Sequence, residues 1–212
     1  MFIDLCEGAN VVLACRVSPK QKAEVVLMVR SRNEHKTTLA IGDGANDVNM
    51  INAAHIGIGI SGLEGQQAVK ASDYAIGKFR FLKNLLLVHG RESYRRNSFA
   101  TCYIFYKNIL ETAPIFWYGC WTIFSGTPVF HLLLYNAFNP VFTSMPIVWF
   151  STMDLEWSKE RLMSDPKLYK YGLRNLHFNY RIFLKWIFYG FWQSCLIIVF
   201  SFYSIVKDSQ NY

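Results

Sequence analysis

The sequence predicts an α/β part with a parallel sheet and flanking helices, followed by an all-α transmembrane region of three helices. Before about residue 90, short apolar runs alternate with stretches whose apolar residues recur at helical spacing. After about residue 97, apolar and aromatic residues concentrate in three spans and bring the hydrophobic fraction of the chain to 52%. We therefore expect one domain over residues 1–90 and a transmembrane region over residues 91–212.

Four apolar runs in the first part are predicted to be strands, at residues 11–15, 37–41, 56–60 and 74–76. Such short apolar runs are typical of strands that are buried on both faces of a parallel sheet. A helix is predicted over Lys20–Arg30, with Ser18 as its N-cap and Pro19 as its first helical residue. A second helix is predicted to open at Asn46 or Asp47.

A glycine-rich acidic loop, Gly42–Asp47, follows the second predicted strand. Its two carboxylates, Asp43 and Asp47, are hard oxygen ligands of the kind that Mg²⁺ prefers and shares with phosphate and water. The glycines let the backbone come close to a phosphate group. For Gly-Asp-Gly alone, a tight turn is the alternative. The neighbouring residues decide in favour of a Mg²⁺ and phosphate site.

Other polar residues also follow strands of this predicted sheet. Arg16 and Ser18 come after the first strand, and Ser61 and Gly62 come after the third. Ligands of an open parallel sheet bind outside the carboxyl ends of its strands, so these residues should face one crevice. Lys22, on the first turn of its helix, can point its ammonium group into that crevice and bind phosphate. The alternative for Lys22 is a solvated surface charge.

Charge and cysteine content exclude several classes of protein. The net charge of +7 does not predict nucleic-acid binding, because the basic residues cluster beside the apolar spans instead of forming one tract. The five cysteines show no ligand spacing, so we expect neither a disulfide framework nor a zinc site.

No signal peptide is predicted in residues 1–10. The chain opens without a first strand or a helix cap, and we expect it to be a fragment of a longer protein.

The three apolar spans cover about residues 98–124, 129–153 and 182–206. Each is about as long as the ~20 residues that a helix needs to cross a bilayer. Basic residues precede the first span and separate the second from the third, whereas residues 125–128 carry no charge. By the positive-inside rule we expect a multi-pass membrane protein with residues 1–90 in the cytoplasm.

Polar residues lie inside the first two spans. Lys107 is about ten residues from the start of the first span, hence ~15 Å deep at 1.5 Å per residue. A charge at that depth marks a transport path or a paired site. Glu111, one turn further on, is the expected partner, and mutual neutralisation between helices is the alternative reading. Asn139, Thr143 and two prolines in the second span are typical of a helix that lines a polar route.

Taken in order, several of these motifs resemble the closing half of the HAD-like phosphorylation domain of P-type ATPases. They are Ser18-Pro19-Lys20-Gln21-Lys22, Gly42-Asp43-Gly44-Ala45-Asn46-Asp47, Gly57-Ile58-Gly59-Ile60-Ser61-Gly62 and Ser72-Asp73-Tyr74-Ala75. Other motifs resemble the phospholipid-translocating, or flippase, branch. They are Cys15-Arg16-Val17-Ser18-Pro19, Leu86-Leu87-Val88-His89-Gly90, Tyr106-Lys107-Asn108 of the fifth membrane helix, and Asn139-x-x-Phe142-Thr143-x-x-Pro146 of the sixth. The usual Tyr before this Asn is Phe138 here.

The resemblance implies a role for each matching residue of the phosphorylation domain. Asp43 and Asp47 would bind Mg²⁺, Lys22 would neutralise phosphoryl charge, Asn46 would hydrogen-bond the phosphoryl group, and Arg16 would lie near the phosphates of ATP. The catalytic residues would then be Lys22, Asn46 and Asp47. The family's phosphorylated aspartate lies in an Asp-Lys-Thr-Gly-Thr motif that does not occur here. We therefore do not expect this chain alone to turn over ATP.

In the membrane part, the resemblance implies that Lys107, Asn108, Asn139 and Thr143 line the path of the lipid. The implied function is that of an ATP-driven flippase fragment, in which Mg²⁺-dependent phosphoryl transfer is coupled to phospholipid movement. Its partners would be ATP, a membrane phospholipid and the bilayer, with an accessory subunit left open and no nucleic acid. The alternatives are a fragment of a P-type cation pump and a catalytically inactive membrane protein with a binding or regulatory role.

Overall fold

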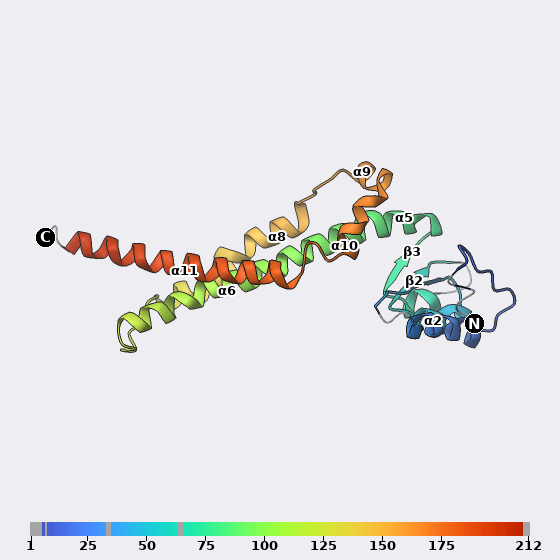
Figure 1. Ribbon diagram of the computed structural model, residues 1–212, viewed down its shortest axis with the longest axis horizontal. Helices are drawn as coiled ribbons and strands as arrows, with labels where there is room; N and C mark the ends of the chain where they lie inside the picture. Colours follow the sequence, from blue (N-terminus) through green and yellow to red (C-terminus); the bar gives the residue numbers. More distant parts are fainter. Residues whose placement is uncertain (1–5, 7, 33–34, 63–65, 210–212) are drawn as a thin grey trace. The chain divides into compact units, whose positions relative to one another are not determined.

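The computed structural model describes residues 6, 8–32, 35–62 and 66–209, with the side chains of the last helix described as far as residue 204. The chain divides into two compact units, Met1–Asn84 and Leu85–Tyr212. Figure 1 follows the chain through a small sheet-containing unit and a unit made of helices.

The first unit contains a three-stranded parallel sheet in the order β1-β2-β3. The strands are β1 (Leu39–Gly42), β2 (Ile56–Ile60) and β3 (Tyr74–Ile76). Leu39 pairs with Ile56, and Ile58 pairs with Tyr74. The central strand is the most buried, with Ile58 only 1% exposed. The predictions for residues 56–60 and 74–76 are confirmed, and the strand predicted at residues 37–41 begins two residues later.

Helices flank this sheet. They are α2 (Pro19–Arg32), η1 (Ala45–Asp47), α3 (Val48–Ala53), α4 (Gln67–Ala71), η2 (Phe79–Phe81) and α5 (Leu82–Asn84). The predicted start of α2 is confirmed by its hydrogen bonds. The amide of Gln21 donates to Ser18 Oγ at 3.3 Å, and the amide of Ser18 donates to Gln21 Oε1 at 2.9 Å. This reciprocal pair is a capping box, which satisfies two backbone donors that the helix leaves free.

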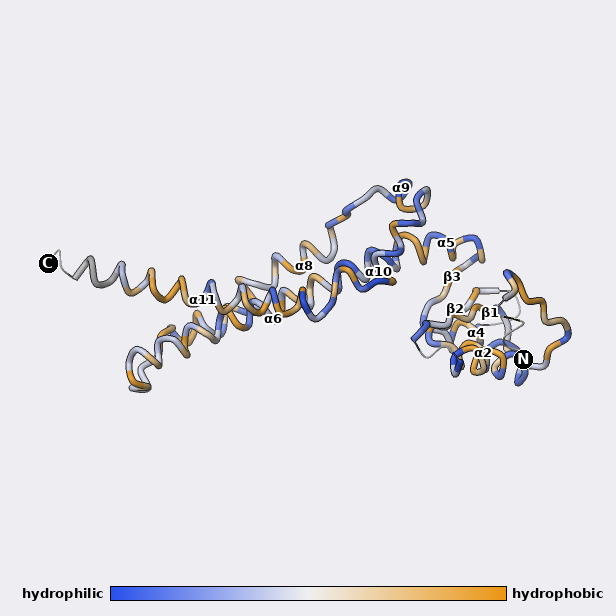
Figure 2. Tube along the Cα trace, viewed as in Figure 1, coloured by the Kyte–Doolittle hydropathy of each residue, from blue (hydrophilic) through white to orange (hydrophobic). Residues whose placement is uncertain are grey.

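The strand predicted at residues 11–15 is wrong. This segment forms no strand, and Val11, Val12 and Leu13 are 73%, 53% and 87% exposed. Figure 2 shows the segment as an apolar loop that precedes α2. An apolar run becomes a buried strand only when a sheet edge pairs with it and other elements cover its faces. Within the described residues, β1 is the edge of the sheet and pairs only with β2.

The second unit is helical within its described residues. Its elements are the π-helical turn η3 (Leu85–Gly90), α6 (Arg91–Trp121), α7 (Leu132–Ala137), the π-helical turn η4 (Phe138–Thr143), α8 (Ser144–Met153), α9 (Lys159–Ser164), η5 (Pro166–Tyr169), α10 (Lys170–Leu173) and α11 (Tyr180–Ser209). The two long helices, α6 and α11, pack against each other, and α8 packs against α6.

The prediction of three membrane spans is confirmed in part. All three segments are helical, but among the described residues only Tyr180–Ser204 of α11 is both long and apolar enough, with a mean hydropathy of 1.6. Polar and charged residues in α6, including Lys107 and Glu111, lower its mean hydropathy. The second predicted span is divided into α7, η4 and α8. The physical reason is Pro140, which has no N–H to donate and widens the helix locally.

A charge cluster joins the start of α6 to the end of α8 and the connection that follows it. Arg91 binds Glu92 at 2.8 Å and Glu156 at 2.7 Å, and Arg95 binds Asp154 at 2.6 Å. The side chains of Arg91 and Glu92 are only 3% and 6% exposed. Buried charges of this kind need opposite partners, because an unpaired one is costly. These arginines, predicted as topology signals, therefore also hold the helical unit together.

His177 lies beside this charge cluster, in the connection between α10 and α11. Its ring lies 5.9 Å from that of Tyr94 and 6.4 Å from that of Tyr171, and its Nε2 atom is buried without a hydrogen-bond partner. Together with Arg95 and Glu156 it lines a cavity of about 270 Å³. Burial lowers the pKa of His177 below its usual value, and although Glu156 raises this pKa, the two neighbouring arginines lower it further.

Gly59 offers a test of the packing in the first unit. A Cβ at this position would lie 2.7 Å from Val69 Cα and 2.8 Å from the carbonyl oxygen of Ala68. Because the backbone of α4 cannot shift without disturbing its packing on β2, we expect Gly59→Ala to destabilise β2 by about 1–3 kcal/mol. Hydrogen exchange of the β2 amides measures this change. The matched control is Gly77→Ala, whose Cβ would make only an ordinary contact at 3.9 Å. Equal exchange in both variants would contradict this account.

The lowered pKa of His177 predicts a pH dependence of stability. The unfolded chain binds a proton at His177 at a higher pH than the folded chain does. The contribution to stability is therefore fully present above the unfolded pKa of about 6.5 and is lost as the pH falls through the folded pKa. We expect the unfolding temperature in detergent to fall less between pH 8 and pH 5.5 for His177→Gln than for the wild type. The control His131→Gln, at an exposed histidine, should follow the wild type. Equal falls for His177→Gln and wild type would reject the effect.

Candidate functional site

Three of the predicted site residues lie together at the carboxyl end of β1. Asp43 follows β1 directly and is exposed, whereas Asp47, on η1, is only 8% exposed. Lys22 reaches across from α2, and its Nζ lies 2.8 Å from Asp47 Oδ1. The other carboxylate oxygen of Asp47 accepts a hydrogen bond from the amide of Asp43 at 3.3 Å. The ammonium group of Lys22 and the carboxylate of Asp47 therefore meet at one strand end, where the backbone of Asp43 is bonded to the same carboxylate.

Gly42 permits this arrangement for a reason that differs from the predicted one. A Cβ at Gly42 would lie 2.2 Å from Asp47 Cβ and 2.7 Å from Asp47 Cγ. Any other residue would displace the carboxylate from its place beside Lys22. The glycine therefore makes room for an aspartate side chain, whereas the sequence suggested only that it let the backbone approach a phosphate group.

Two other predicted site residues are not joined to this group. Asn46 is exposed on η1. Arg16 is also exposed and has φ +54°, a left-handed backbone that is uncommon outside glycine. No hydrogen bond or ion pair links either side chain to Asp43 or Asp47 in the described part of the chain. Both side chains are free to meet a ligand from solution.

The carboxylates at this strand end fit Mg²⁺ better than a metal that needs a full protein cage. No group of three or more His, Cys, Asp or Glu side chains that could hold a metal occurs among the described residues. Mg²⁺ is commonly bound through one or two carboxylates, with water and substrate phosphate in its remaining positions. Asp43 and Asp47 supply that number, and Lys22 supplies a positive charge for the phosphate.

A second polar site lies between α6 and the π-helical turn η4, and it consists of two hydrogen-bonded rungs. In one, Lys107 Nζ donates to Thr143 Oγ1 at 3.2 Å. In the other, Asn139 Nδ2 donates to Glu111 Oε2 at 2.6 Å. The predicted pairing of Lys107 with Glu111 is wrong, since the described residues show no such ion pair. Instead, a neutral side chain on η4 reaches each of the two charges.

Side chains of η4 also form hydrogen bonds to the backbone of this irregular turn. Thr143 Oγ1 donates to the carbonyl oxygen of Phe138 at 3.0 Å, and the Ser144 hydroxyl donates to that of Asn139. Side-chain hydroxyls thus add hydrogen bonds to the carbonyl groups of the two residues just before Pro140. Tyr103 adds a hydrogen bond from its hydroxyl to the carbonyl oxygen of Thr143 at 3.3 Å.

Asn108 and Tyr103 differ from what the motifs suggested. Asn108, a predicted path residue, is exposed, and its carbonyl oxygen accepts a hydrogen bond from Thr112 Oγ1 at 2.8 Å. Its side chain does not join the two rungs. Tyr103 was not predicted, although its spacing one turn before Lys107 would have placed it on the same face of a helix.

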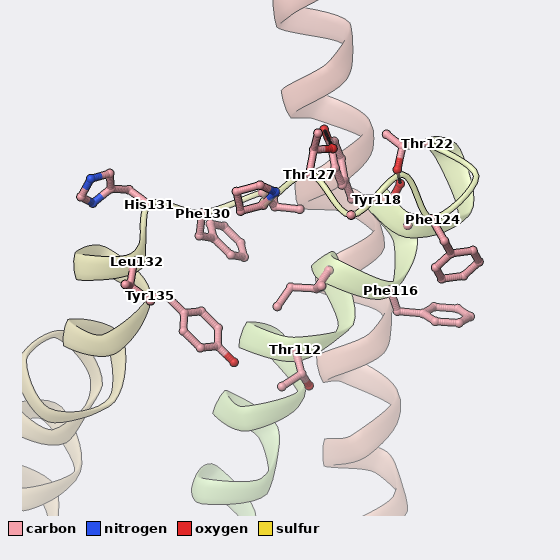
Figure 3. Close-up of a pocket in the computed structure, with 15 residues that line it drawn as sticks. Thr112, Phe116, Tyr118, Thr122, Phe124, Thr127, Phe130, His131, Leu132 and Tyr135 are labelled. Atoms are coloured by element: carbon pink, nitrogen blue, oxygen red, sulfur yellow. Dashed lines mark hydrogen bonds between the residues drawn. The ribbon is translucent and has the colours of Figure 1, made fainter.

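A cavity of about 870 Å³ lies where α6 ends and the chain turns into α7. Figure 3 shows its hydroxyl-bearing and aromatic side chains, among them Thr112 and Tyr118 from α6 and Tyr135 from α7. The connection contributes Thr127 and Phe130. The sequence signalled only an uncharged turn here, because the cavity forms only once the turn brings the end of α6 and the start of α7 together.

Comparison with known proteins identifies the family. A family model described as phospholipid-translocating P-type ATPase C-terminal matches residues 69–212. The chain is 45% identical over 212 residues to probable phospholipid-transporting ATPase 12 of Arabidopsis thaliana, covering 100% of this chain and 18% of that protein. It is 45% identical over 208 residues to phospholipid-transporting ATPase ID of Homo sapiens, covering 98% and 17%.

A further relative, phospholipid-transporting ATPase 10 of Arabidopsis thaliana, is 46% identical over 200 residues, covering 94% of this chain and 16% of that protein. The chain therefore spans less than a fifth of the length of these relatives. The family match covers the whole of the helical unit, and the pairwise similarity extends through the strand-end residues as well. On these grounds the chain belongs to the phospholipid-translocating P-type ATPase family.

Proposed function

We propose that the full-length protein carrying this chain is an ATP-driven phospholipid flippase. Residues 1–90 would form the cytoplasmic, HAD-like part of its phosphorylation domain, and residues 91–212 would contribute three spans of a multi-pass membrane region. ATP and Mg²⁺ would act at the strand end of β1, and a phospholipid would pass the polar rungs on α6 and η4.

The contact between Lys22 and Asp47 is the observation that carries this proposal. At 2.8 Å, Asp47 holds the ammonium group of Lys22 at the strand end before any phosphate arrives. Preorganised charges of this kind need little rearrangement when phosphoryl charge develops, which is how phosphoryl transfer is mostly catalysed. Asp43, exposed beside them, remains available as a metal ligand.

The residues around this contact would bind the metal ion, the phosphoryl group and the nucleotide. Asp43 and Asp47 would hold Mg²⁺, which supplies charge neutralisation at the transferred phosphoryl group. Lys22 would bind a phosphoryl oxygen, and the exposed amide of Asn46 would hydrogen-bond the same group. Arg16 would bind the phosphates of the nucleotide. The aspartate nucleophile would come from outside these 212 residues, because they contain no Asp-Lys-Thr-Gly-Thr sequence.

The membrane part supports lipid movement over cation transport. Lys107 is held by a neutral hydroxyl, so its ammonium group can attract a lipid phosphate and would repel a metal cation. Asn139, Thr143 and the exposed Asn108 add neutral polar groups along the same stretch. A cation pump would instead need several carboxylates around the ion, whereas Glu111 is the only one between Lys107 and Met153.

Replacing Asp43 tests the chemical half of the proposal. In the full-length protein we expect Asp43→Asn to reduce ATP hydrolysis by about 100-fold or more, because it removes a charged ligand of the metal. The control is Glu24→Gln, an exposed change on α2 that should leave hydrolysis within about twofold of the wild type. Hydrolysis of Asp43→Asn near the wild-type rate would reject the assigned role.

Replacing Lys107 tests the transport half. We expect Lys107→Ala to lower lipid-stimulated ATP turnover by about tenfold while phosphoenzyme still forms at close to the wild-type level, since the ammonium group would act on the lipid and not on ATP. Lys185→Ala, at the start of α11 beside Tyr189, is the control. Normal lipid stimulation of Lys107→Ala would remove Lys107 from the lipid path.

A further inference from the structure

Tyr106, the residue before Lys107, is held by three positions on α11. Its hydroxyl donates a hydrogen bond to Gln193 Oε1. Its ring meets that of Trp186 edge-on, with the ring centroids 5.7 Å apart. A Cβ on Gly190 would lie only 3.3 Å from the carbonyl oxygen of Tyr106, so the two helices approach closely here. Positions 186, 190 and 193 recur at helical spacing and therefore form one face of α11.

Gln193 is an isolated polar group in an apolar helix. It carries the only side-chain amide of α11, and no charged residue lies between Lys185 and Ser204. A polar side chain in an apolar span is costly unless it finds a partner, and membrane helices use such side chains to bind one another. Ser194 does so further along α6, where its hydroxyl accepts a hydrogen bond from Trp117 Nε1 at 3.1 Å. Gln193 instead joins the two helices directly beside Lys107.

The position of Tyr106 sets the direction of Lys107. Successive residues of an α-helix are turned by about 100° around its axis, so the direction of one side chain fixes that of the next. With Tyr106 bound to α11, Lys107 is turned toward η4, where its Nζ donates to Thr143 Oγ1 at 3.2 Å. The ring of Tyr103 lies 6.3 Å from that of Tyr106, and its hydroxyl donates to the carbonyl oxygen of Thr143 at 3.3 Å. A contact with α11 thus determines how α6 presents its ammonium group to η4.

We propose that Gln193 is a positioning residue for Lys107, because it holds α6 in the rotation that presents the ammonium group to a lipid phosphate. This inference rests on the proposed transport function and adds to it a residue of α11, a helix to which the motifs assigned no role. No hydrogen bond joins Gln193 to Lys107 within the described part of the chain, so the effect must pass through Tyr106. Without this bond α6 can turn, and Lys107 faces η4 for a smaller fraction of the time.

The proposal predicts that loss of this hydrogen bond matters only while Lys107 is present. ATP turnover of the full-length protein is measured in detergent micelles against the concentration of an equal mixture of phosphatidylcholine, phosphatidylethanolamine and phosphatidylserine. We expect Gln193→Leu to raise the half-stimulating lipid concentration about fivefold in the otherwise wild-type protein. In the Lys107→Ala protein the same change should have no further effect, because two substitutions that act through one group are not additive. Phosphoenzyme formation should stay close to the wild-type level.

Two further variants assign the effect to the hydrogen bond. Tyr106→Phe keeps the ring and removes the donor, so it should raise the half-stimulating concentration by the same factor as Gln193→Leu. Combining the two should add nothing, since both remove one bond. The control is Ser204→Ala on the same helix, whose hydroxyl donates to the carbonyl oxygen of Phe200, and it should behave as the wild type does. Should Gln193→Leu not fold, Tyr106→Phe with and without Lys107 decides.

The outcomes separate this inference from the function on which it rests. Equal effects of Gln193→Leu with and without Lys107, or a parallel loss of phosphoenzyme and lipid stimulation, would reveal a structural role and reject the proposal. If Lys107→Ala weakens lipid stimulation while Gln193→Leu leaves it unchanged, the inference fails and the proposed function stands. If Lys107→Ala responds to lipid as the wild type does, the proposed lipid path fails and the inference fails with it.

Discussion

A charged group removed from water must find a polar partner, and the structure of this chain depends on how that requirement is met. Asp47 meets it with Lys22 at the end of β1, and Arg91 meets it with Glu92 and Glu156 at the start of α6. The contacts of Lys22 with Asp47 and of Arg91 with Glu156 join different parts of the fold and thereby hold them in place. Within α6 and η4 the requirement is met only in part, by neutral groups.

This difference separates structural charges from charges that are available to a ligand. The Arg91 guanidinium has a carboxylate on two sides and is almost fully buried, so it has no capacity left for a substrate. Among the described residues, Lys107 and Glu111 each have one neutral partner, and Asn139 keeps an acceptor unmet. An incompletely satisfied polar site in an apolar surrounding is costly, and transport proteins accept this cost where a substrate must bind and leave.

The membership in a family of phospholipid-translocating P-type ATPases connects the two units. The family match begins within the first unit at residue 69 and continues to residue 212, while relatives align with the strand-end residues as well. The acidic loop and the polar rungs thus belong to one lineage of proteins. Glu111 is a residue that the recognised motifs do not contain, and its significance comes from its contacts in this chain.

Local patterns in the sequence were sufficient to predict most of the helices and strands. Ser18 and Pro19 predicted the start of α2, and alternating short apolar and helical runs predicted the parallel pairing of the three observed strands. These features depend on neighbours along the chain, namely capping groups and side-chain periodicity. The same reasoning failed at residues 11–15, because burial of a strand depends on neighbours in space that the described residues do not provide.

The sequence by itself determined the family resemblance, the acidic loop and the presence of charges inside an apolar span. Only the tertiary structure decided which groups meet. Gly42 is needed because Asp47 lies across it, Lys107 binds Thr143 instead of Glu111, and His177 lies beside the charge cluster. Partners separated by tens of residues leave no periodic signal in the sequence. Their pairing follows from helix packing and from the widened turn at Pro140, which direct side chains toward one another across elements.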